Sequence, residues 1–151
     1  MDIGVASLTD TDVRTLITEH QQRMFDASPP GTSFALDLSG FDRPNVTLFA
    51  ARLDRNLLGI GAMRELSSSV GEIKSMRTTD ATLRRGVGKA ILEFILETAR
   101  TRKYEKVVLE TGTGPVFEPA NKLYQRNGFV RCDPFGEYAE SDFNVFYEKT
   151  L

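Results

Sequence analysis

The sequence predicts an α/β domain built on a mixed sheet. Two short apolar runs near the middle of the chain have the pattern of a β-hairpin, and the later half alternates strand-like and helix-like periods. With 151 residues, the chain has the size of one domain and is long enough to bury a core. No internal repeat divides it. We therefore expect residues 1–151 to form a single domain.

The first third of the chain predicts a short strand and one helix. Residues 3–6 suit a strand, and the polar residues 9–12 supply helix caps before an apolar pattern of helical spacing. The run Ser28-Pro29-Pro30-Gly31-Thr32 ends that pattern. We expect the segment from there to Pro44 to be irregular or to contain a short helix.

Three strands are predicted next. Residues 46–51 and 57–63 are apolar and joined by Asp54-Arg55-Asn56, which indicates a hairpin. In a third strand, residues 70–78, strict alternation places Glu72, Lys74 and Met76 on one face. A strand with such mixed faces either lies near a sheet edge or lines a wet cleft, and the sequence slightly favours the edge.

The rest of the chain predicts two helices and three strands. Apolar residues at helical spacing from Val87 to Ala99 indicate a long amphipathic helix. Residues 107–109 read as a buried strand, and a second helix follows Pro119 and ends near Gly128. The tail suggests two strands around a loop rich in aromatic and acidic residues.

Charge and composition remove several classes of function. The 19 Lys and Arg nearly balance the 21 Asp and Glu, giving a formal charge of −2, so no general attraction to nucleic acid or to an anionic membrane is expected. One cysteine, Cys132, and one histidine, His20, predict neither a disulfide nor an ordinary zinc site. We expect a metal-free cytoplasmic protein with His20 exposed.

A basic glycine-rich segment precedes the long helix. Its residues are Arg84-Arg85-Gly86-Val87-Gly88-Lys89. Glycines let a ligand approach the backbone, the first-turn N–H groups are free, and cations at this positive end of the helix dipole favour a bound anion. The segment is neither a Walker loop nor a three-glycine dinucleotide motif. Phosphate binding and a tight turn with solvated charges both remain open.

Two motifs resemble the GNAT superfamily of acyl-coenzyme-A-dependent N-acetyltransferases. The stretch from Leu83 to Gly88 resembles its Gln/Arg-x-x-Gly-x-Gly/Ala loop, with Leu83 departing at the first position. The stretch from Ala120 to Phe129 matches its Ala-x-x-Leu-Tyr-x-x-x-Gly-Phe signature, although Phe117 replaces an Asn often found upstream. The resemblance implies a mixed, mostly antiparallel sheet flanked by helices, with a splayed parallel strand pair in the middle.

The resemblance also implies acetyl-CoA as co-substrate. Its pyrophosphate would sit on the backbone N–H groups of the glycine segment, and its pantetheine arm would pair with the preceding strand like an extra strand. The residues implied in cofactor binding are Met76, Arg77, Thr78, Arg84, Arg85, Gly86, Val87, Gly88, Lys89, Thr111, Asn121 and Tyr124.

The same resemblance assigns catalytic roles. Tyr124 is the expected acid that protonates the departing thiolate, and Glu72 is the expected base for the amine, with Glu110 as the weaker alternative. A backbone N–H of the Met76 strand would hold the oxyanion. The competing interpretations are a core tyrosine for Tyr124 and a solvated strand residue for Glu72.

The acceptor is expected to be a primary amine of a small molecule. Aromatic and acidic side chains of the early loop and the late loop would rim its site: Phe34, Asp37, Phe135, Glu137, Tyr138, Glu140 and Asp142. A non-catalytic acyl-CoA sensor or interaction module of the same fold is the alternative, and a phosphate-binding regulatory domain is a third. Pairing of two copies through the last strands is also left open.

Overall fold

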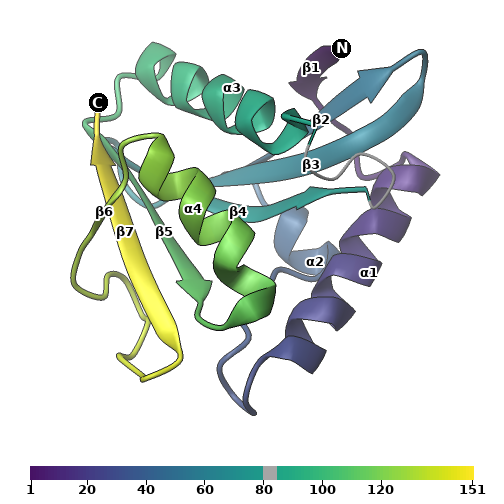
Figure 1. The fold of residues 1–151 in the computed structure, drawn as a ribbon. Coiled ribbons are helices and arrows are strands. Elements are labelled where there is room, and N and C mark those ends of the chain that lie inside the picture. The colour runs from purple at the N-terminus through teal and green to yellow at the C-terminus, as the bar shows by residue number, and fades with distance from the viewer. Residues whose placement is uncertain (80–84) are drawn as a thin grey trace.

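A computed structural model describes residues 1–79 and 85–151. Its described residues form a seven-stranded sheet in the order β1-β2-β3-β4-β5-β7-β6, in which only β4 and β5 run parallel (Figure 1). The strands are β1 (Asp2–Val5), β2 (Val46–Leu53), β3 (Asn56–Glu65), β4 (Val70–Thr78), β5 (Lys106–Gly112), β6 (Val130–Arg131) and β7 (Asn144–Thr150). The predicted mixed, mostly antiparallel sheet is confirmed.

Helices connect and cover these strands. They are α1 (Thr11–Ala27), α2 (Leu38–Phe41), α3 (Val87–Thr101) and α4 (Glu118–Arg126), with a 3₁₀ turn η2 (Pro115–Phe117) before α4. The three predicted helices, seen as α1, α3 and α4, the short helix before Pro44 and the two tail strands are present. Within the described ranges, no helix is long and apolar enough to cross a membrane.

The predicted hairpin is confirmed, but the edge interpretation of the third strand is wrong. β2 and β3 are joined by Asp54 and Arg55, both at positive φ (49° and 70°), as a tight two-residue hairpin turn requires. β4 lies in the middle of the sheet between β3 and β5. Glu72 and Lys74 of β4 are therefore buried in the interior of the molecule instead of lying at a sheet edge.

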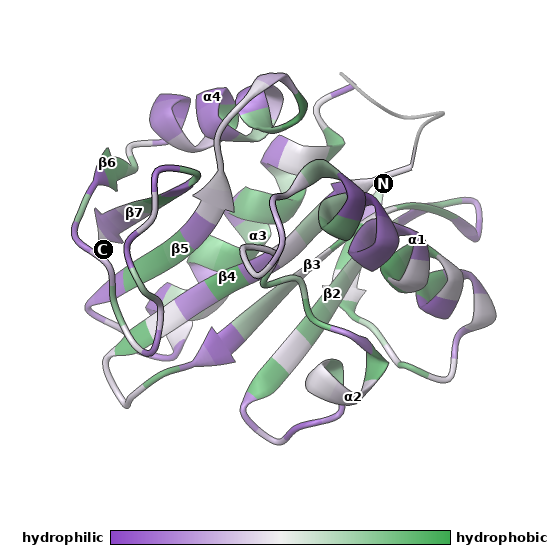
Figure 2. Ribbon diagram, turned by 90° about the horizontal axis from the view of Figure 1, so that it is seen from below, coloured by the Kyte–Doolittle hydropathy of each residue, from purple (hydrophilic) through white to green (hydrophobic). Residues whose placement is uncertain are grey.

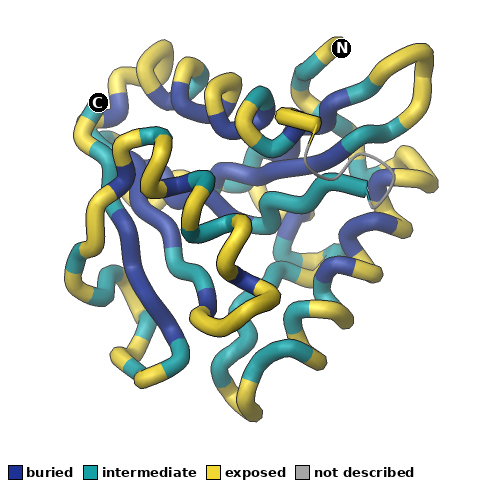
Figure 3. The backbone as a smooth tube through the Cα atoms, viewed as in Figure 1, coloured by how far each residue is buried: buried dark blue, intermediate teal, exposed yellow. Residues whose placement is uncertain are grey.

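Each face of the sheet carries its own apolar cluster. One cluster joins α3 and Tyr124 of α4 to the sheet, and α3 contributes its apolar stripe, including Ile91, Leu92 and Ile95. The other joins α1 and α2 to β2 and β3 on the opposite face. Figure 3 shows the resulting pattern, in which buried residues follow the strands and the inner sides of the helices while the outer turns are exposed.

The parallel pair β4 and β5 separates partway along its length. Pairing runs only from Val70↔Lys106 to Ile73↔Leu109, and beyond it β4 continues to Thr78 beside β3 alone. Figure 1 shows the two strands starting side by side and then diverging beneath α4. The splayed pair implied by the resemblance is present.

A bulge at Ser75 corrects the predicted faces of β4. Ser75 has a φ of 56°, and the register with β3 shifts by one residue there. Ile73 and Met76 consequently both face the α3 cluster, whereas Glu72 and Lys74 lie on the α1 face, where they meet Tyr138. The expectation that Met76 shares a face with Glu72 and Lys74 is wrong because the extra residue reverses the alternation.

Candidate active site

The start of α3 has the geometry of an anion site. Gly86 is the N-cap in a left-handed conformation (φ 79°), and among the described residues, apart from its chain neighbours and the backbone of α3, no atom lies within 4 Å of where its Cβ would be. The first helical hydrogen bond, from the N–H of Ala90 to the oxygen of Gly86, leaves the N–H groups of Val87, Gly88 and Lys89 without helical partners. These donors suit phosphate oxygens.

The glycine segment meets the end of β4 and the second half of α4. The Cβ position of Gly88 lies 3.5 Å from Leu123 of α4 and 4.0 Å from Thr78 of β4. Lys89 is an exposed cation there and pairs with Glu93 at 3.8 Å. Arg84, also predicted to bind the cofactor, lies outside the described residues.

The open edge of β4 runs toward this helix start. After the bulge that includes Met76, Arg77 and Thr78 pair with β3 on one side, and on the other side the diverging β5 provides no strand partner among the described residues. Backbone groups along such an edge can pair with an extended amide-containing arm. The predicted contacts of these residues and of Arg85 with a cofactor stay predictions, but the geometry fits coenzyme A.

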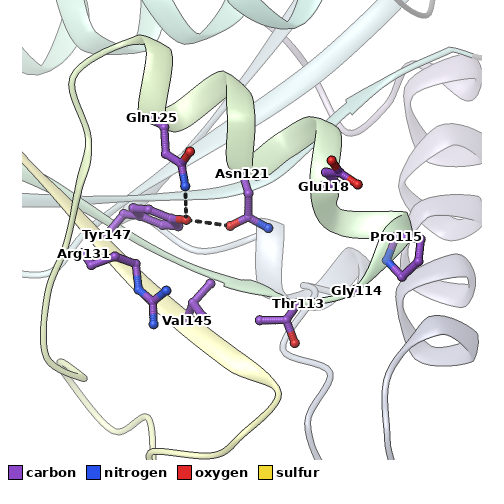
Figure 4. A pocket seen from close by; sticks show the side chains of 9 residues that line it. All are labelled: Thr113, Gly114, Pro115, Glu118, Asn121, Gln125, Arg131, Val145 and Tyr147. Atoms are coloured by element: carbon purple, nitrogen blue, oxygen red, sulfur yellow. Dashed lines mark hydrogen bonds between the residues drawn. The ribbon is translucent and has the colours of Figure 1, made fainter.

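Asn121 holds α4 against the sheet. Its amide nitrogen donates to the carbonyl oxygens of Gly112 (3.0 Å) and Phe117 (2.9 Å), and its amide oxygen accepts from the Tyr147 hydroxyl (2.9 Å). Gln125 also donates to that hydroxyl (3.1 Å), as Figure 4 shows. The predicted cofactor contact of Asn121 is untested, and its polar atoms are already engaged inside the protein.

These residues also line a shallow pocket of about 440 Å³ between α4 and β7. Its lining is Thr113, Gly114, Pro115, Glu118, Asn121, Gln125, Arg131, Val145 and Tyr147 (Figure 4). Thr111 is half-buried on β5, opposite Val145 of β7. Its predicted contact with the thioester remains a prediction.

Tyr124 is buried in the last turn of α4. Its ring packs edge-on against Phe129 (5.7 Å between centroids), and it belongs to the α3 cluster. No hydrogen bond joins its hydroxyl to another described residue. Burial raises the pKa of Tyr124, and the nearby Glu110 carboxylate raises it further. The hydroxyl is therefore protonated at neutral pH and can donate a proton or a hydrogen bond.

Glu72 is fully buried and held by partners on both carboxylate oxygens. Oε1 accepts from Nε (3.0 Å) and Nη2 (2.5 Å) of Arg64, and Oε2 accepts from the Tyr138 hydroxyl (2.6 Å). Lys74 Nζ lies 3.9 Å from Oε2. The interpretation of Glu72 as a solvated strand residue is wrong, because the carboxylate is enclosed in an ion-pair network.

Lys74 extends this network along β4. Its ammonium donates to the Tyr138 hydroxyl (2.6 Å) and lies 5.2 Å from the centre of the Tyr138 ring. Burial lowers the pKa of Lys74, while the Glu72 charge opposes that change. Burial likewise raises the pKa of Tyr138, which stays a neutral bridge between Lys74 and Glu72.

Glu110 lies on β5 directly after the last residue paired with β4. Asn144 of β7 donates its amide N–H to Oε2 of Glu110 and is itself held by Ser141. Burial raises the pKa of Glu110 to about 7, although the Asn144 hydrogen bond and Lys74 act in the opposite direction. A carboxyl group with such a pKa can take up and release a proton near neutral pH.

The structure thus gathers Glu72, Lys74, Glu110 and Tyr138 on the α1 face. From the sequence, Glu110 was only the weaker alternative as base, and Lys74 and Asn144 had no assigned role. Because strand alternation already places Lys74 on the same face as Glu72, the sequence could have predicted that Lys74 belongs to the site. Asn144 becomes relevant only through the pairing of β7 with β5.

The expectation that His20 is exposed is wrong. His20 is 8% exposed on the inner side of α1, and burial, with Arg77 and Arg23 nearby, lowers its pKa to about 4. Its Nδ1 has no hydrogen-bond partner within the described part of the chain.

Part of the predicted rim is assembled. Phe34 and Phe135 pack edge-on against Tyr138, at 5.0 and 5.3 Å between ring centres, and Phe135 also packs on Phe146 of β7. Asp37 instead caps α2 through the N–H of Gly40. Among residues 1–79 and 85–151, no group of three or more His, Cys, Asp or Glu side chains could hold a metal ion.

Comparison with known proteins agrees with this arrangement. Residues 10–129 match the model of the acetyltransferase (GNAT) family. The chain is 44% identical to the uncharacterized N-acetyltransferase YsnE of Bacillus subtilis over the full length of both chains. It is 40% identical to the uncharacterized N-acetyltransferase YedL of Escherichia coli, over 99% of this chain and 94% of that one.

A solved structure shows the same fold. A GNAT family acetyltransferase from Elizabethkingia anophelis, with acetyl-CoA bound, superposes with a TM-score of 0.69 at 16% identity, covering 99% of this chain and 97% of that one. The family match, the two relatives and the splayed strand pair beside the glycine segment lead to one conclusion. The chain belongs to the GNAT family of acetyltransferases.

Proposed function

We propose that this protein transfers the acetyl group of acetyl-CoA to a primary amine of a small molecule. The observation that carries the proposal is the opening between β4 and β5, which begins at Lys74 and Glu110 and continues toward the anion-binding start of α3. One end of the opening suits phosphates and the other holds titratable groups. Because this chemistry draws on acetyl-CoA, we also propose a cytoplasmic location.

Acetyl-CoA supplies a thioester, an activated acyl group that an amine can attack without a covalent enzyme intermediate. The amine nitrogen forms a bond to the acyl carbon and the carbon–sulfur bond breaks. A proton leaves the amine, and the departing sulfur gains one, so the products are an amide and the free thiol. The protein has to receive the first proton and provide the second.

We propose Glu110 as the base in place of Glu72. Both Glu72 oxygens already accept hydrogen bonds from Arg64 and Tyr138, so neither is free to face the amine of an acceptor. Glu110 lies at the opening and has a pKa of about 7. Glu72 would then be a positioning residue that holds Tyr138 and Lys74.

We propose Tyr124 as the acid. Its hydroxyl stays protonated because burial raises its pKa, and the charge of Glu110 acts on it across the opening. A phenol with a raised pKa is a poor proton donor to a thiolate. Tyr124 would therefore act chiefly by hydrogen bonding to the negative charge that develops on the sulfur.

The direct test has two stages. Acetyl-CoA at millimolar concentration should raise the melting temperature through binding linkage, and ATP should not compete with it. Release of free thiol should then depend on an added amine. No thermal shift would sink cofactor binding, and a shift without thiol release from a broad amine panel would favour the non-catalytic acyl-CoA sensor instead. Competition by ATP would favour the phosphate-binding regulatory domain.

A further inference from the structure

Lys74 and Glu110 face each other across the point where β4 and β5 separate. The last paired residues are Ile73 and Leu109, so Lys74 and Glu110 occupy the next position on each strand. Both side chains lie on the α1 face, because Lys74 meets Tyr138 and Glu110 meets Asn144 there. Paired strands lie about 4.8 Å apart, and the two backbones separate beyond this position.

Lys74 shares the buried anion of this cluster, Glu72, with a second cation, since its ammonium lies 3.9 Å from Oε2 while Arg64 donates two hydrogen bonds to Oε1. Arg64 and Lys74 are cations, and the carboxylate of Glu72 is engaged by two hydrogen bonds from Arg64 and one from Tyr138. Among hydrogen bonds between described residues, the Lys74 ammonium makes one, to Tyr138. Glu110 forms no ion pair with any described residue. When Glu110 binds the amine of an acceptor, the charge of Lys74 needs another partner.

We propose that the acceptor is zwitterionic, a small α-amino acid or a close relative whose carboxylate binds Lys74 while its amine binds Glu110. This inference rests on the proposed function and names the substrate class of the same site. The two side chains offer an anion and a cation at neighbouring positions of two adjacent strands, and an amino acid offers the complementary pair on one carbon. A ligand with both charges keeps every charge of the cluster paired.

The surroundings keep Lys74 in place for this role. Tyr138 holds the ammonium through its hydroxyl, and Phe34, Phe135 and Phe146 pack around the Tyr138 ring. Only 7% of the Lys74 side chain is exposed. A cation with little contact to water gains more from an added carboxylate than an exposed lysine does, so the carboxylate contributes to selectivity.

The test compares matched acceptors. Free thiol release is measured for an L-amino acid panel, for the corresponding amino acid amides and for the decarboxylated amines. We expect kcat/KM for at least one amino acid to exceed that for its amide by about tenfold or more. The amine of an amide is less basic and more often neutral, so this preference would oppose intrinsic reactivity. Equal or faster turnover of the amides and decarboxylated amines would overturn the inference and leave the proposed function intact.

Variants of Lys74 assign the preference to this residue. Lys74→Met should reduce the ratio of kcat/KM between amino acid and amide to about one, and Lys74→Arg should restore part of it. Lys106→Met is the matched control, because Lys106 lies at the start of β5 and pairs with Glu148. A ratio that survives in Lys74→Met, with melting and acetyl-CoA binding retained, would contradict the role of Lys74.

Binding separates this inference from catalysis. Calorimetric titration of the protein–coenzyme A complex with the same amino acids and amides should show binding of the amino acid and weaker binding of the amide. Amino acid binding without thiol release would support the inference while counting against the proposed transfer. Thiol release with other amines but no amino acid binding would do the opposite.

Discussion

The two halves of β4 belong to one strand but differ in how many neighbouring strands they pair with. Residues 70–73 pair on both sides, with β3 and with β5, and Glu72 and Ile73 are buried completely or nearly so. Residues 74–78 pair with β3 alone and are mostly half-buried. The paired half satisfies its groups inside the protein, whereas the splayed half leaves backbone and side-chain groups for a ligand.

The contrast is clearest in the two carboxylates that flank the point of separation. Glu72 belongs to the paired half and has three hydrogen bonds from protein donors. Glu110 lies just past the paired part of β5 and has Asn144 as its hydrogen-bond partner. We therefore expect Glu72 to matter for stability and Glu110 for catalysis, and the following substitutions test this division.

The largest effect is expected for Glu110→Gln. Loss of a general base should lower kcat/KM by about 10²–10³-fold, since a base contributes on the order of 10²–10⁴-fold. In the unmodified protein kcat/KM should rise with pH up to about 7, the pKa of Glu110, and this rise should disappear in the variant. Steady-state thiol release between pH 5.5 and 9 measures both. An unchanged profile would remove Glu110 from the reaction.

The stability of Glu110→Gln relative to the unmodified protein should depend on pH. The pKa of Glu110 in the folded protein, about 7, exceeds the ordinary value of 4.5 for a glutamate side chain, so the folded state holds the proton more tightly. The unmodified protein should therefore lose stability as pH rises from about 4.5 to 7, by on the order of 3 kcal/mol, while Glu110→Gln should not. Urea unfolding at pH 5 and pH 8 gives the two differences. Equal pH dependence would contradict the raised pKa.

Glu72→Gln should act mainly on stability. It leaves Arg64 and Lys74 without their buried anion, and breaking such a pair costs about 3 kcal/mol, which lowers the melting temperature by roughly 6–12 °C. Glu110→Gln, studied beside it at pH 7.5, should show no such loss. If Glu72→Gln keeps its stability and loses the acidic limb of the pH profile, Glu72 is the base after all.

Tyr124→Phe should lower kcat by about 10–100-fold with little change in the affinity for acetyl-CoA. The hydroxyl makes no hydrogen bond to another described residue, so its removal should shift the melting temperature only slightly. Thiol release and thermal titration with acetyl-CoA measure the two effects. A Tyr124→Phe variant with unchanged kcat would support the interpretation of Tyr124 as a core residue.

The smallest effect is expected for Gly86→Ala. Alanine at a φ of 79° costs about 1 kcal/mol, and space around the Cβ position means that no clash adds to this cost. The changed helix start should raise the KM for acetyl-CoA about fivefold while the KM for the amine stays constant. Gly31→Ala is a matched control, because Gly31 has the same φ in an open environment away from α3. Equal effects of the two variants would indicate backbone strain alone.

Local patterns were sufficient for most of the fold. The hairpin turn at Asp54 and Arg55, the apolar stripe of α3 and the extent of β4 from Val70 to Thr78 all follow from neighbouring residues. The errors were the edge position expected for β4, the faces expected for its residues and the exposure expected for His20. A bulge depends on how a strand pairs with its neighbours, and the burial of a lone polar residue depends on which elements pack over it. Neither can be predicted from the spacing of apolar residues along one segment.

Of the candidate site, the sequence by itself determined the glycine segment at the start of α3, the helix that carries Tyr124 and the acidic and basic residues of β4. These features depend on contacts between residues close in the chain. The tertiary structure was needed to show that Glu72 is enclosed by Arg64 and Tyr138 while Glu110, held by Asn144, lies beyond the last paired residue of β5. That division arises from strand pairing and from where it stops, which depends on residues far apart in the sequence.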